Sequence, residues 1–207
     1  MTIALDLRIS ELLTARLCHE LVGSITAVAN GADLLCEPGL EVDQEALALI
    51  QESARRASSR LQFYRFAYGF SGHGPATGLP PHELAAGFFA TSQVTCRYPE
   101  NVRALSLVEQ KLACNLLVFG SEALVRGGEV AAAVAGPGLR LEAAGEVISV
   151  VPEQIDALAL ALPIAEVTPR TAHAYFTGLL ARAQSSRLTV NVAGPGRLSV
   201  TSVSSPH

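Results

Sequence analysis

The sequence has 207 residues, few of them charged, and it lacks any cluster of lysine or arginine. Its net charge is −4, so a nucleic acid is not expected to be its main partner. Charged residues make up 16% of the chain and hydrophobic residues 49%, which is typical of a globular protein and not of a disordered one. The length allows one large domain or two small domains with hydrophobic cores.

Neither a signal peptide nor a membrane-spanning segment is expected. Asp6 and Arg8 interrupt the only apolar stretch of the first ten residues, where a signal peptide needs a continuous apolar region. Residues 147–165 are largely apolar, but Pro152 and Pro163 divide them into pieces far shorter than the roughly 18 residues of a membrane helix. We therefore expect this segment to form buried helix and strand.

The cysteines and histidines show no spacing typical of a metal site. No two cysteines have the Cys-x-x-Cys spacing of a zinc or redox pair. The four cysteines are Cys18, Cys36, Cys96 and Cys114. Without a secretion signal they are expected to be reduced, buried thiols of a cytoplasmic protein. The histidines besides His19 are His73, His82, His173 and His207, and they form no recognisable set with carboxylates or thiols. A metalloenzyme is therefore not expected.

Residues 1–70 have the pattern of a helical hairpin. A first helix is expected from about Ser10 to Leu35, and the Pro-Gly signal in the segment CEPGL that begins at Cys36 ends it. A second helix has apolar residues in steps of three and four, at Leu47, Ile50, Ala54, Ala57, Leu61 and Tyr64. A hairpin buries only one side of each apolar face, so pairing with a second copy into a dimeric four-helix bundle is expected.

Residues 71–81 are rich in glycine and proline and are expected to be a linker to a second domain at 82–207. Ser106 and Glu109 form a capping box at the start of a helix that reaches about Val125. Thr168-Pro169 is expected to begin a helix that reaches about Ala183. The other expected elements are a helix at 82–90 and strands at 93–98, 129–135, 139–144, 188–193 and 198–203. Together they predict an α/β two-layer sandwich.

The segment RLCHELVGSI, residues 16–25, places a histidine on the polar side of the first helix. With about 100° of rotation per residue, His19 lies about 200° from Leu17, which is on the apolar face. Its neighbours on that side include Arg16, Gly23 and Thr26. We therefore expect the imidazole to face solvent, with open space above Gly23.

An exposed helical histidine can accept and donate a phosphoryl group without a substrate pocket. Imidazole is largely neutral and nucleophilic near pH 7, and a partner can bring the metal ion and the carboxylate. Glu20 is a candidate to orient the ring or to take its proton, and Arg16 to stabilise the phosphoryl charge. Surface charge without a catalytic role is the alternative for both. The candidate partner-binding residues around His19 are Leu12, Ala15, Gly23 and Thr26.

RLCHELVGSI resembles the H box of the dimerization and histidine-phosphotransfer domain of two-component signalling proteins. The chain as a whole is similar to the ChpT family of bacterial histidine phosphotransferases. Three segments carry the similarity: ARLCHELVGSITAVANGADLL (15–35), RLQFYRFAYG (60–69) and ALVRGGEV (123–130). The resemblance implies a dimeric four-helix bundle flanked by two domains that resemble the Bergerat-type ATP-binding domain of histidine kinases but no longer bind ATP.

The resemblance also implies partners. Such a protein receives a phosphoryl group on its histidine, here His19, from the receiver aspartate of a hybrid histidine kinase (CckA-like). It passes the group to receiver aspartates of response regulators (CtrA-like or CpdR-like) that control the cell cycle or development. It has no cofactor of its own, because the receiver brings magnesium. One departure is Ser24, where kinase H boxes usually have proline, so less kinking of the helix is expected.

Two other functions remain open at this point. The first is an autophosphorylating kinase, but the sequence has no Asp-x-Gly-x-Gly loop for adenine, and Phe119 stands where a magnesium-binding asparagine is expected. Asn115 is then interpreted as a polar contact of its helix. The second is a non-catalytic dimeric scaffold in which His19 has no role. Phe63 and Tyr64 are expected to pack against the second domain or the bundle, with partner contact as the alternative.

Overall fold

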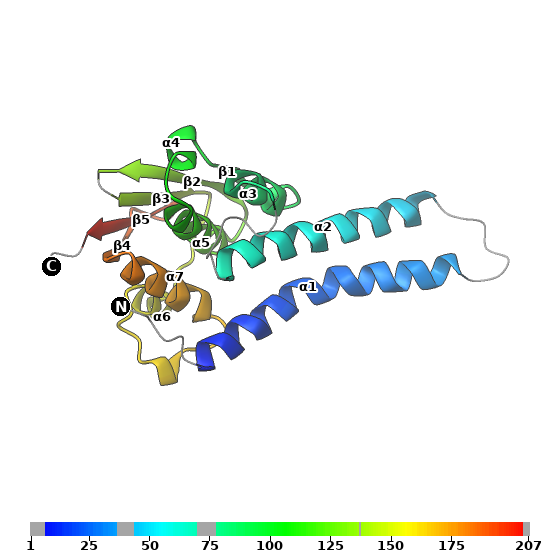
Figure 1. Ribbon diagram of the computed structural model, residues 1–207, viewed down its shortest axis with the longest axis horizontal. Coiled ribbons are helices and arrows are strands. Elements are labelled where there is room, and N and C mark those ends of the chain that lie inside the picture. Colours follow the sequence, from blue (N-terminus) through cyan, green and yellow to red (C-terminus); the bar gives the residue numbers. More distant parts are fainter. Residues whose placement is uncertain (1–6, 37–43, 70–77, 137, 205–207) are drawn as a thin grey trace.

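The computed structural model describes residues 7–36, 44–69, 78–136 and 138–204. Two long antiparallel helices project from an α/β domain (Figure 1). They are α1 (Leu7–Leu35) and α2 (Gln44–Tyr68), and α1 runs through Ser24 without a break. Most of the predicted turn after Cys36 and of the predicted linker lies outside the described residues.

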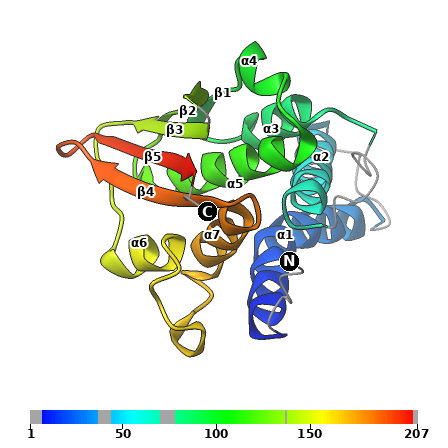
Figure 2. The ribbon, with the colours of Figure 1, turned by 60° about the vertical axis from the view of Figure 1, so that its left-hand side comes forward.

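The α/β domain contains a five-stranded sheet with helices packed on one face (Figure 2). The strands are β1 (Val94–Arg97), β2 (Gly128–Ala135), β3 (Gly138–Ala144), β4 (Ser186–Val192) and β5 (Arg197–Ser204). The helices are α3 (Pro81–Phe89), α4 (Glu100–Arg103), α5 (Leu107–Ala123), α6 (Pro152–Leu158) and α7 (Ala172–Ala183), with a 3-10 turn η1 at Ile164–Glu166. The strand order is β1-β2-β3-β5-β4, parallel between β1 and β2 and antiparallel elsewhere. A helical N-terminal region beside an α/β domain confirms the predicted fold class.

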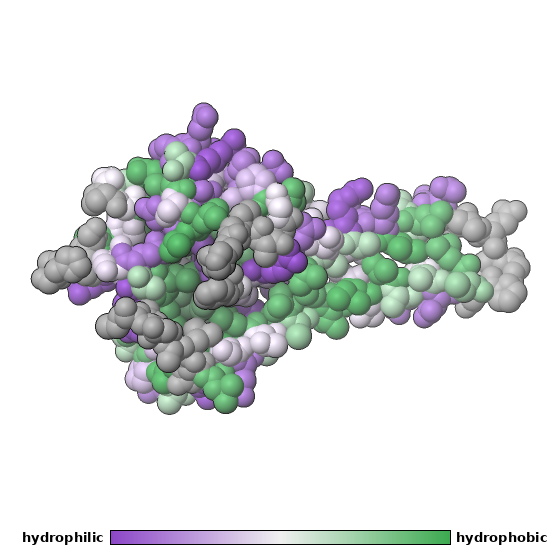
Figure 3. All heavy atoms as spheres, viewed as in Figure 1, coloured by the Kyte–Doolittle hydropathy of each residue, from purple (hydrophilic) through white to green (hydrophobic). Residues whose placement is uncertain are grey.

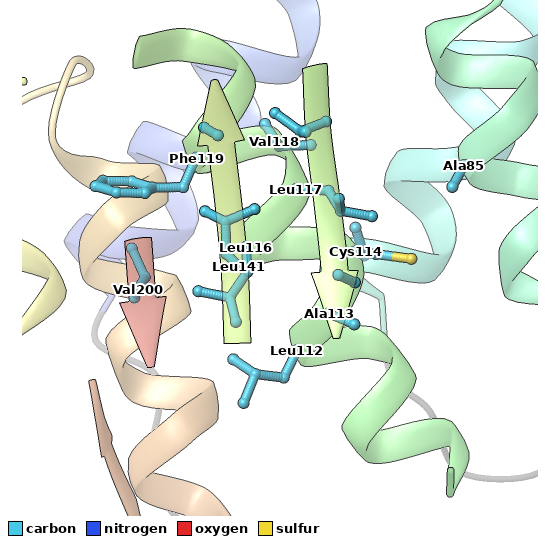
Figure 4. Close-up of a cluster of buried hydrophobic side chains, with 14 of the residues drawn as sticks. Ala85, Leu112, Ala113, Cys114, Leu116, Leu117, Val118, Phe119, Leu141 and Val200 are labelled. Atoms are coloured by element: carbon cyan, nitrogen blue, oxygen red, sulfur yellow. The ribbon is translucent and has the colours of Figure 1, made fainter. Parts of the chain in front are cut away.

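The main core lies between α5 and the sheet. Leu116 of α5, Leu141 of β3 and Val200 of β5 are at most 1% exposed and lie in one cluster of apolar side chains (Figure 4). Strand β3 alternates buried and exposed residues, as expected for a strand with one face on the core. At Gly120 of α5, an added Cβ would lie 2.8 Å from the Leu141 side chain, so glycine allows α5 to approach β3 closely.

The two predicted helix starts differ in outcome. The capping box is confirmed, because the Glu109 backbone N–H donates to Ser106 Oγ and the Ser106 backbone N–H donates to the Glu109 carboxylate. The predicted start at Thr168-Pro169 is wrong, since α7 begins at Ala172. The Thr168 carbonyl accepts bonds from the N–H groups of Thr171 and Ala172, so residues 168–171 form a turn before the helix. Short helices α4 and α6 were not predicted as separate elements.

The last turns of α2 are buried in the α/β domain. Phe63 is 0% and Tyr64 2% exposed, and both rings pack against Phe88 of α3, with a centroid distance of 4.3 Å for Phe63. This confirms the prediction that they pack against the second domain. The first turns of α1 make a smaller apolar contact with α7 and the segment before it, through Ile9, Leu13, Val167, Ala172 and Phe176. The hairpin is thus attached at its base.

A chain of buried polar groups also crosses this junction. Tyr68 Oη lies 3.0 Å from His173 Nδ1, and His173 Nε2 lies 3.0 Å from the carbonyl oxygen of Asn115. A carbonyl only accepts, so Nε2 carries the ring proton and Nδ1 accepts the Tyr68 hydroxyl. The Asn115 amide donates to the Ala67 carbonyl, 3.0 Å away, which confirms its interpretation as a polar contact of α5. The α/β domain therefore binds α2 through hydrogen bonds as well as through the aromatic cluster.

The prediction that all four thiols are buried is wrong. Cys114 is buried and Cys96 is partly buried, but Cys18 and Cys36 are exposed on the hairpin, and all four are free. The reason is that the two hairpin helices, which carry Cys18, keep much of their surface in solvent, whereas the α/β domain encloses α5, which carries Cys114.

Replacing His173 with glutamine should reduce the pH dependence of stability. Burial lowers the pKa of His173 to about 3, so the folded protein does not take up the proton that the unfolded chain binds below about pH 6.5. The free energy of unfolding should therefore fall as the pH falls from about 6.5 towards 3. This residue contributes up to about 1.4 kcal/mol per pH unit, which His173→Gln removes.

Urea unfolding of both proteins at about pH 7.5, 6 and 5 measures this difference. Burial raises the pKa of Glu122 to about 7, which acts in the opposite sense but is common to both proteins. His82→Gln is the matched control, because it also removes a histidine but from a partly buried position outside this hydrogen-bonded chain. The effect of His173→Gln should exceed that of the control. If the free energy of unfolding changed equally with pH in wild type and His173→Gln, the assignment of a buried neutral imidazole would be contradicted.

Candidate functional site

His19 lies near the middle of α1 and is exposed, as the sequence predicts. Its helix continues for three turns or more on both sides, so the backbone N–H groups around it are already bonded within the helix. Gly23 is one turn further on, and a Cβ built there would have no atom within 4 Å. The predicted open space above the histidine is therefore confirmed.

A groove of about 340 Å³ runs along the hairpin beside this histidine. Helix α1 contributes His19, Glu20, Gly23 and Ser24 to its walls, and α2 contributes Arg56 and Arg60. His19 is exposed at this groove, so a partner domain has direct access to the imidazole.

Glu20 is held by α2. Its carboxylate accepts a hydrogen bond from Arg60, and both side chains keep 28% of their surface exposed. The Arg60 guanidinium also lies 5.5 Å from the centroid of the Phe88 ring of α3, within the range of a cation–π contact. The pair fixes Glu20 next to the phosphoacceptor candidate and links α1, α2 and the α/β domain at one level of the hairpin.

Arg16 points towards the α/β domain. Its guanidinium pairs with Glu122 at the end of α5, and only 14% of the Arg16 side chain is exposed. Burial opposes its charge, but the Glu122 carboxylate raises the pKa of Arg16 above its ordinary value. In this arrangement the Arg16 guanidinium is engaged with Glu122, and its role in phosphoryl transfer stays a prediction.

The predicted partner-binding residues occupy different surroundings. Gly23 lines the groove with His19, and Ala15 and Thr26 are exposed on α1. Leu12 is partly buried against the small apolar cluster that joins α1 to α7, so it already has an intramolecular contact. Their binding to a partner stays a prediction.

Sequence reasoning missed the two arginines of the groove. Arg56 and Arg60 are one helical turn apart on α2 and therefore share a face, which the i,i+4 spacing could have revealed. What the spacing alone cannot show is that this face lies beside His19. That follows from how α1 and α2 pack.

The described residues show no group of three or more metal-ligating side chains. In α5, Asn115 is 0% and Phe119 3% exposed, and the Asn115 amide is bonded to α2. The chemistry available at the groove is thus that of an exposed imidazole beside a carboxylate and two guanidinium groups. Such a set can exchange a phosphoryl group with a partner that brings its own acceptor or donor.

Comparison with known proteins agrees with this chemistry. Residues 81–196 match the family model described as the histidine phosphotransferase C-terminal domain. The chain is 31% identical over 195 residues to the protein phosphotransferase ChpT of Brucella abortus (strain 2308), covering 91% of each chain. It also matches the solved structure of a bacterial phosphotransferase with a TM-score of 0.74 and 27% identity, over 98% of both chains.

The family match covers more than half of the chain, and the relative and the solved structure extend it over the helical hairpin that carries His19. The chain belongs to the ChpT-type histidine phosphotransferases.

Proposed function

We propose that this protein carries phosphoryl groups between receiver domains in a bacterial phosphorelay, with His19 as the phosphoacceptor. The exposure of His19 in an open groove at the middle of α1 is the observation that carries the proposal. A buried histidine such as His173 offers no such access.

The transfer balances as a displacement at phosphorus. A ring nitrogen of His19 attacks the phosphorus of an aspartyl phosphate, and the electron pair of the breaking P–O bond stays on the aspartate. The other ring nitrogen then loses its proton to Glu20 or to water. The reverse steps deliver the group to the aspartate of the next receiver. Magnesium bound to the receiver would neutralise charge on the phosphoryl oxygens.

The donor is proposed to be the receiver domain of a hybrid histidine kinase (CckA-like) and the acceptors to be response regulators (CtrA-like or CpdR-like). We propose no ATP binding by the α/β domain. The contacts of Asn115 support this, since its amide is directed to the Ala67 carbonyl of α2 and buried there. The burial of Phe119 in the core gives further support.

A homodimer is part of the proposal. The hairpin exposes several large apolar side chains, and its apolar surface is continuous in Figure 3. These residues are Val22, Ile25, Leu34, Leu47, Leu49 and Leu61. Single exposed apolar residues are common, but several of them on two packed helices favour a bundle that a second copy completes.

The same apolar character makes α1 long and apolar enough, by length and composition, to cross a membrane. However, Arg16 and Glu20 lie inside this helix and pair with α5 and α2. We propose that its apolar surface is covered by the second copy and that the protein is cytoplasmic.

His19→Ala should abolish acceptance of the phosphoryl group and leave the fold and the dimer intact, because an exposed side chain contributes little to stability. The measurement uses labelled ATP, with and without a purified hybrid kinase of the CckA type. Cys18→Ser, the exposed neighbour in α1, is the control and should accept label normally. Label on wild type from ATP alone would instead indicate a kinase. If wild type took up no label from a phosphorylated receiver that is known to be competent, a non-catalytic scaffold would be the remaining function.

Gly23→Leu should block receiver docking without harming the fold. Nothing lies within 4 Å of a Cβ at this position, and glycine inside a helix is unfavourable by up to about 1 kcal/mol, so the melting temperature should be unchanged or higher. Transfer from the phosphorylated receiver should slow by about tenfold or more, the factor expected when a close interface loses about 1.4 kcal/mol. Unchanged transfer would show that the receiver does not approach over Gly23.

Aspartate at Ile25 and Leu61 should separate the dimer. Burying each residue contributes about 1.5–3 kcal/mol, and a carboxylate in its place is costly to bury, so the dissociation constant should rise at least about 100-fold. Light scattering measures the change. Val108→Asp, at an equally exposed apolar residue of the α/β domain, is the control and should remain dimeric. A dimeric double variant would contradict the proposed interface.

A further inference from the structure

The phosphoryl group on His19 needs positive charge from side chains. It carries about two negative charges near pH 7, and transfer depends mainly on positioning and charge neutralisation. His19 lies inside α1, where the backbone N–H groups are bonded to carbonyls of the preceding turn. Unlike a phosphate at a helix N-terminus, this group finds no free backbone donors. The cation must come from a neighbouring side chain or from the partner.

Three other basic side chains that contact the hairpin or belong to it are already engaged. Arg16 pairs with Glu122 of α5, and Arg60 pairs with Glu20 while lying over the Phe88 ring. Lys111, the single lysine of the sequence, donates to the carbonyl of Gly69 at the end of α2. None of these three guanidinium or ammonium groups is free to follow a phosphoryl group without breaking an existing contact.

Arg56 differs from them. It lines the groove together with His19, its side chain is exposed, and it makes no hydrogen bond or ion pair with the part of the chain that the structure describes. The preceding residue, Arg55, does not line the groove and pairs with Glu52 at 3.1 Å. Adjacent residues of α2 thus carry the same charge in different positions relative to His19.

We propose that Arg56 is a catalytic residue that binds the phosphoryl group during transfer to and from His19. The inference rests on the proposed function of His19. The guanidinium of Arg56 donates N–H hydrogen bonds to non-bridging phosphoryl oxygens, while the N–P bond forms and the P–O bond to aspartate breaks. No bond within Arg56 changes. The arginine stays protonated throughout, so it neutralises charge without taking part in proton transfer.

Phosphoramidate is a suitable probe, because it tests the phosphoryl contact without a receiver. One ring nitrogen of His19 attacks its phosphorus, the P–N bond breaks, and its electron pair stays on the departing ammonia. The other ring nitrogen then loses its proton, which ammonia takes up from solution. Labelling of His19 is followed by peptide mapping at alkaline pH, and labelling of the partly exposed His82 in α3 is the internal reference. The proteins compared are wild type, Arg56→Ala, Arg56→Lys, Arg55→Ala and His19→Ala.

Arg56→Ala should label His19 about fivefold more slowly than wild type, the factor that one exposed charge contact provides. Arg56→Lys should recover part of the rate, and Arg55→Ala should match wild type, although it loses the same charge. The rate ratio of wild type to Arg56→Ala should shrink at high salt, because salt screens an exposed contact. A purely structural role for Arg56 predicts neither the salt dependence nor the recovery with lysine.

Equal rates for Arg56→Ala and Arg55→Ala would overturn the inference. A defect in Arg56→Ala that appears only with a phosphorylated receiver, and not with phosphoramidate, would also overturn it, because Arg56 would then bind the partner's surface. The His19→Ala variant and the peptide map distinguish failure of the inference about Arg56 from failure of the proposed function of His19. If mapped phosphorylation in wild type lies elsewhere than His19, the proposed function fails. If it lies on His19 and Arg56 has no effect, only the inference about Arg56 fails.

Discussion

The burial of the last turns of α2 in the α/β domain fixes the rest of the molecule. Phe63, Tyr64 and Phe66 are each at most 7% exposed, and they attach the helix to α3 and α5. Each such side chain contributes about 1.5–3 kcal/mol when it leaves water, so this contact is strong enough to orient a long hairpin. Because α1 packs along α2, the same contact also places His19 beside the groove and outside the core.

Polar groups make this attachment specific. The hydrogen bonds from Tyr68 to His173 and from His173 to the Asn115 carbonyl require one relative position of α2, α5 and α7. An unpaired buried polar group costs about 1–3 kcal/mol, so other arrangements of these helices are disfavoured. Asn115 therefore has a structural role here, because its amide and its carbonyl help to join α5 to α2 and α7.

The outer part of the hairpin is subject to a different constraint. Two helices cannot cover each other completely, and the apolar side chains left in solvent include Ile25 and Leu49, at 55% and 69% exposure. Around α1, Ile25 lies about 120° from His19, so the proposed second copy and the proposed receiver domain need not cover the same part of the helix.

Some of the site could be predicted from local sequence because the helical period alone decides it. The exposure of His19, the open space at Gly23 and the capping box at Ser106 each depend on residues within one or two turns. The pairing of Arg16 with Glu122 could not be predicted, since 106 positions separate the two residues. The partial burial of Leu12 and the exposure of Cys18 and Cys36 likewise depend on which surfaces the α/β domain covers.

The sequence by itself determined most of the element types, the fold class and the identity of the phosphoacceptor candidate, because these follow from short-range periodicity and from a local motif. Only the tertiary structure decided which charged groups surround His19. In the folded chain Arg16 pairs with Glu122 and Arg60 with Glu20, whereas Arg56 lines the groove with His19. The reason is physical: an ion pair forms where packing brings two charges within a few ångströms, and packing joins residues that are far apart in the sequence.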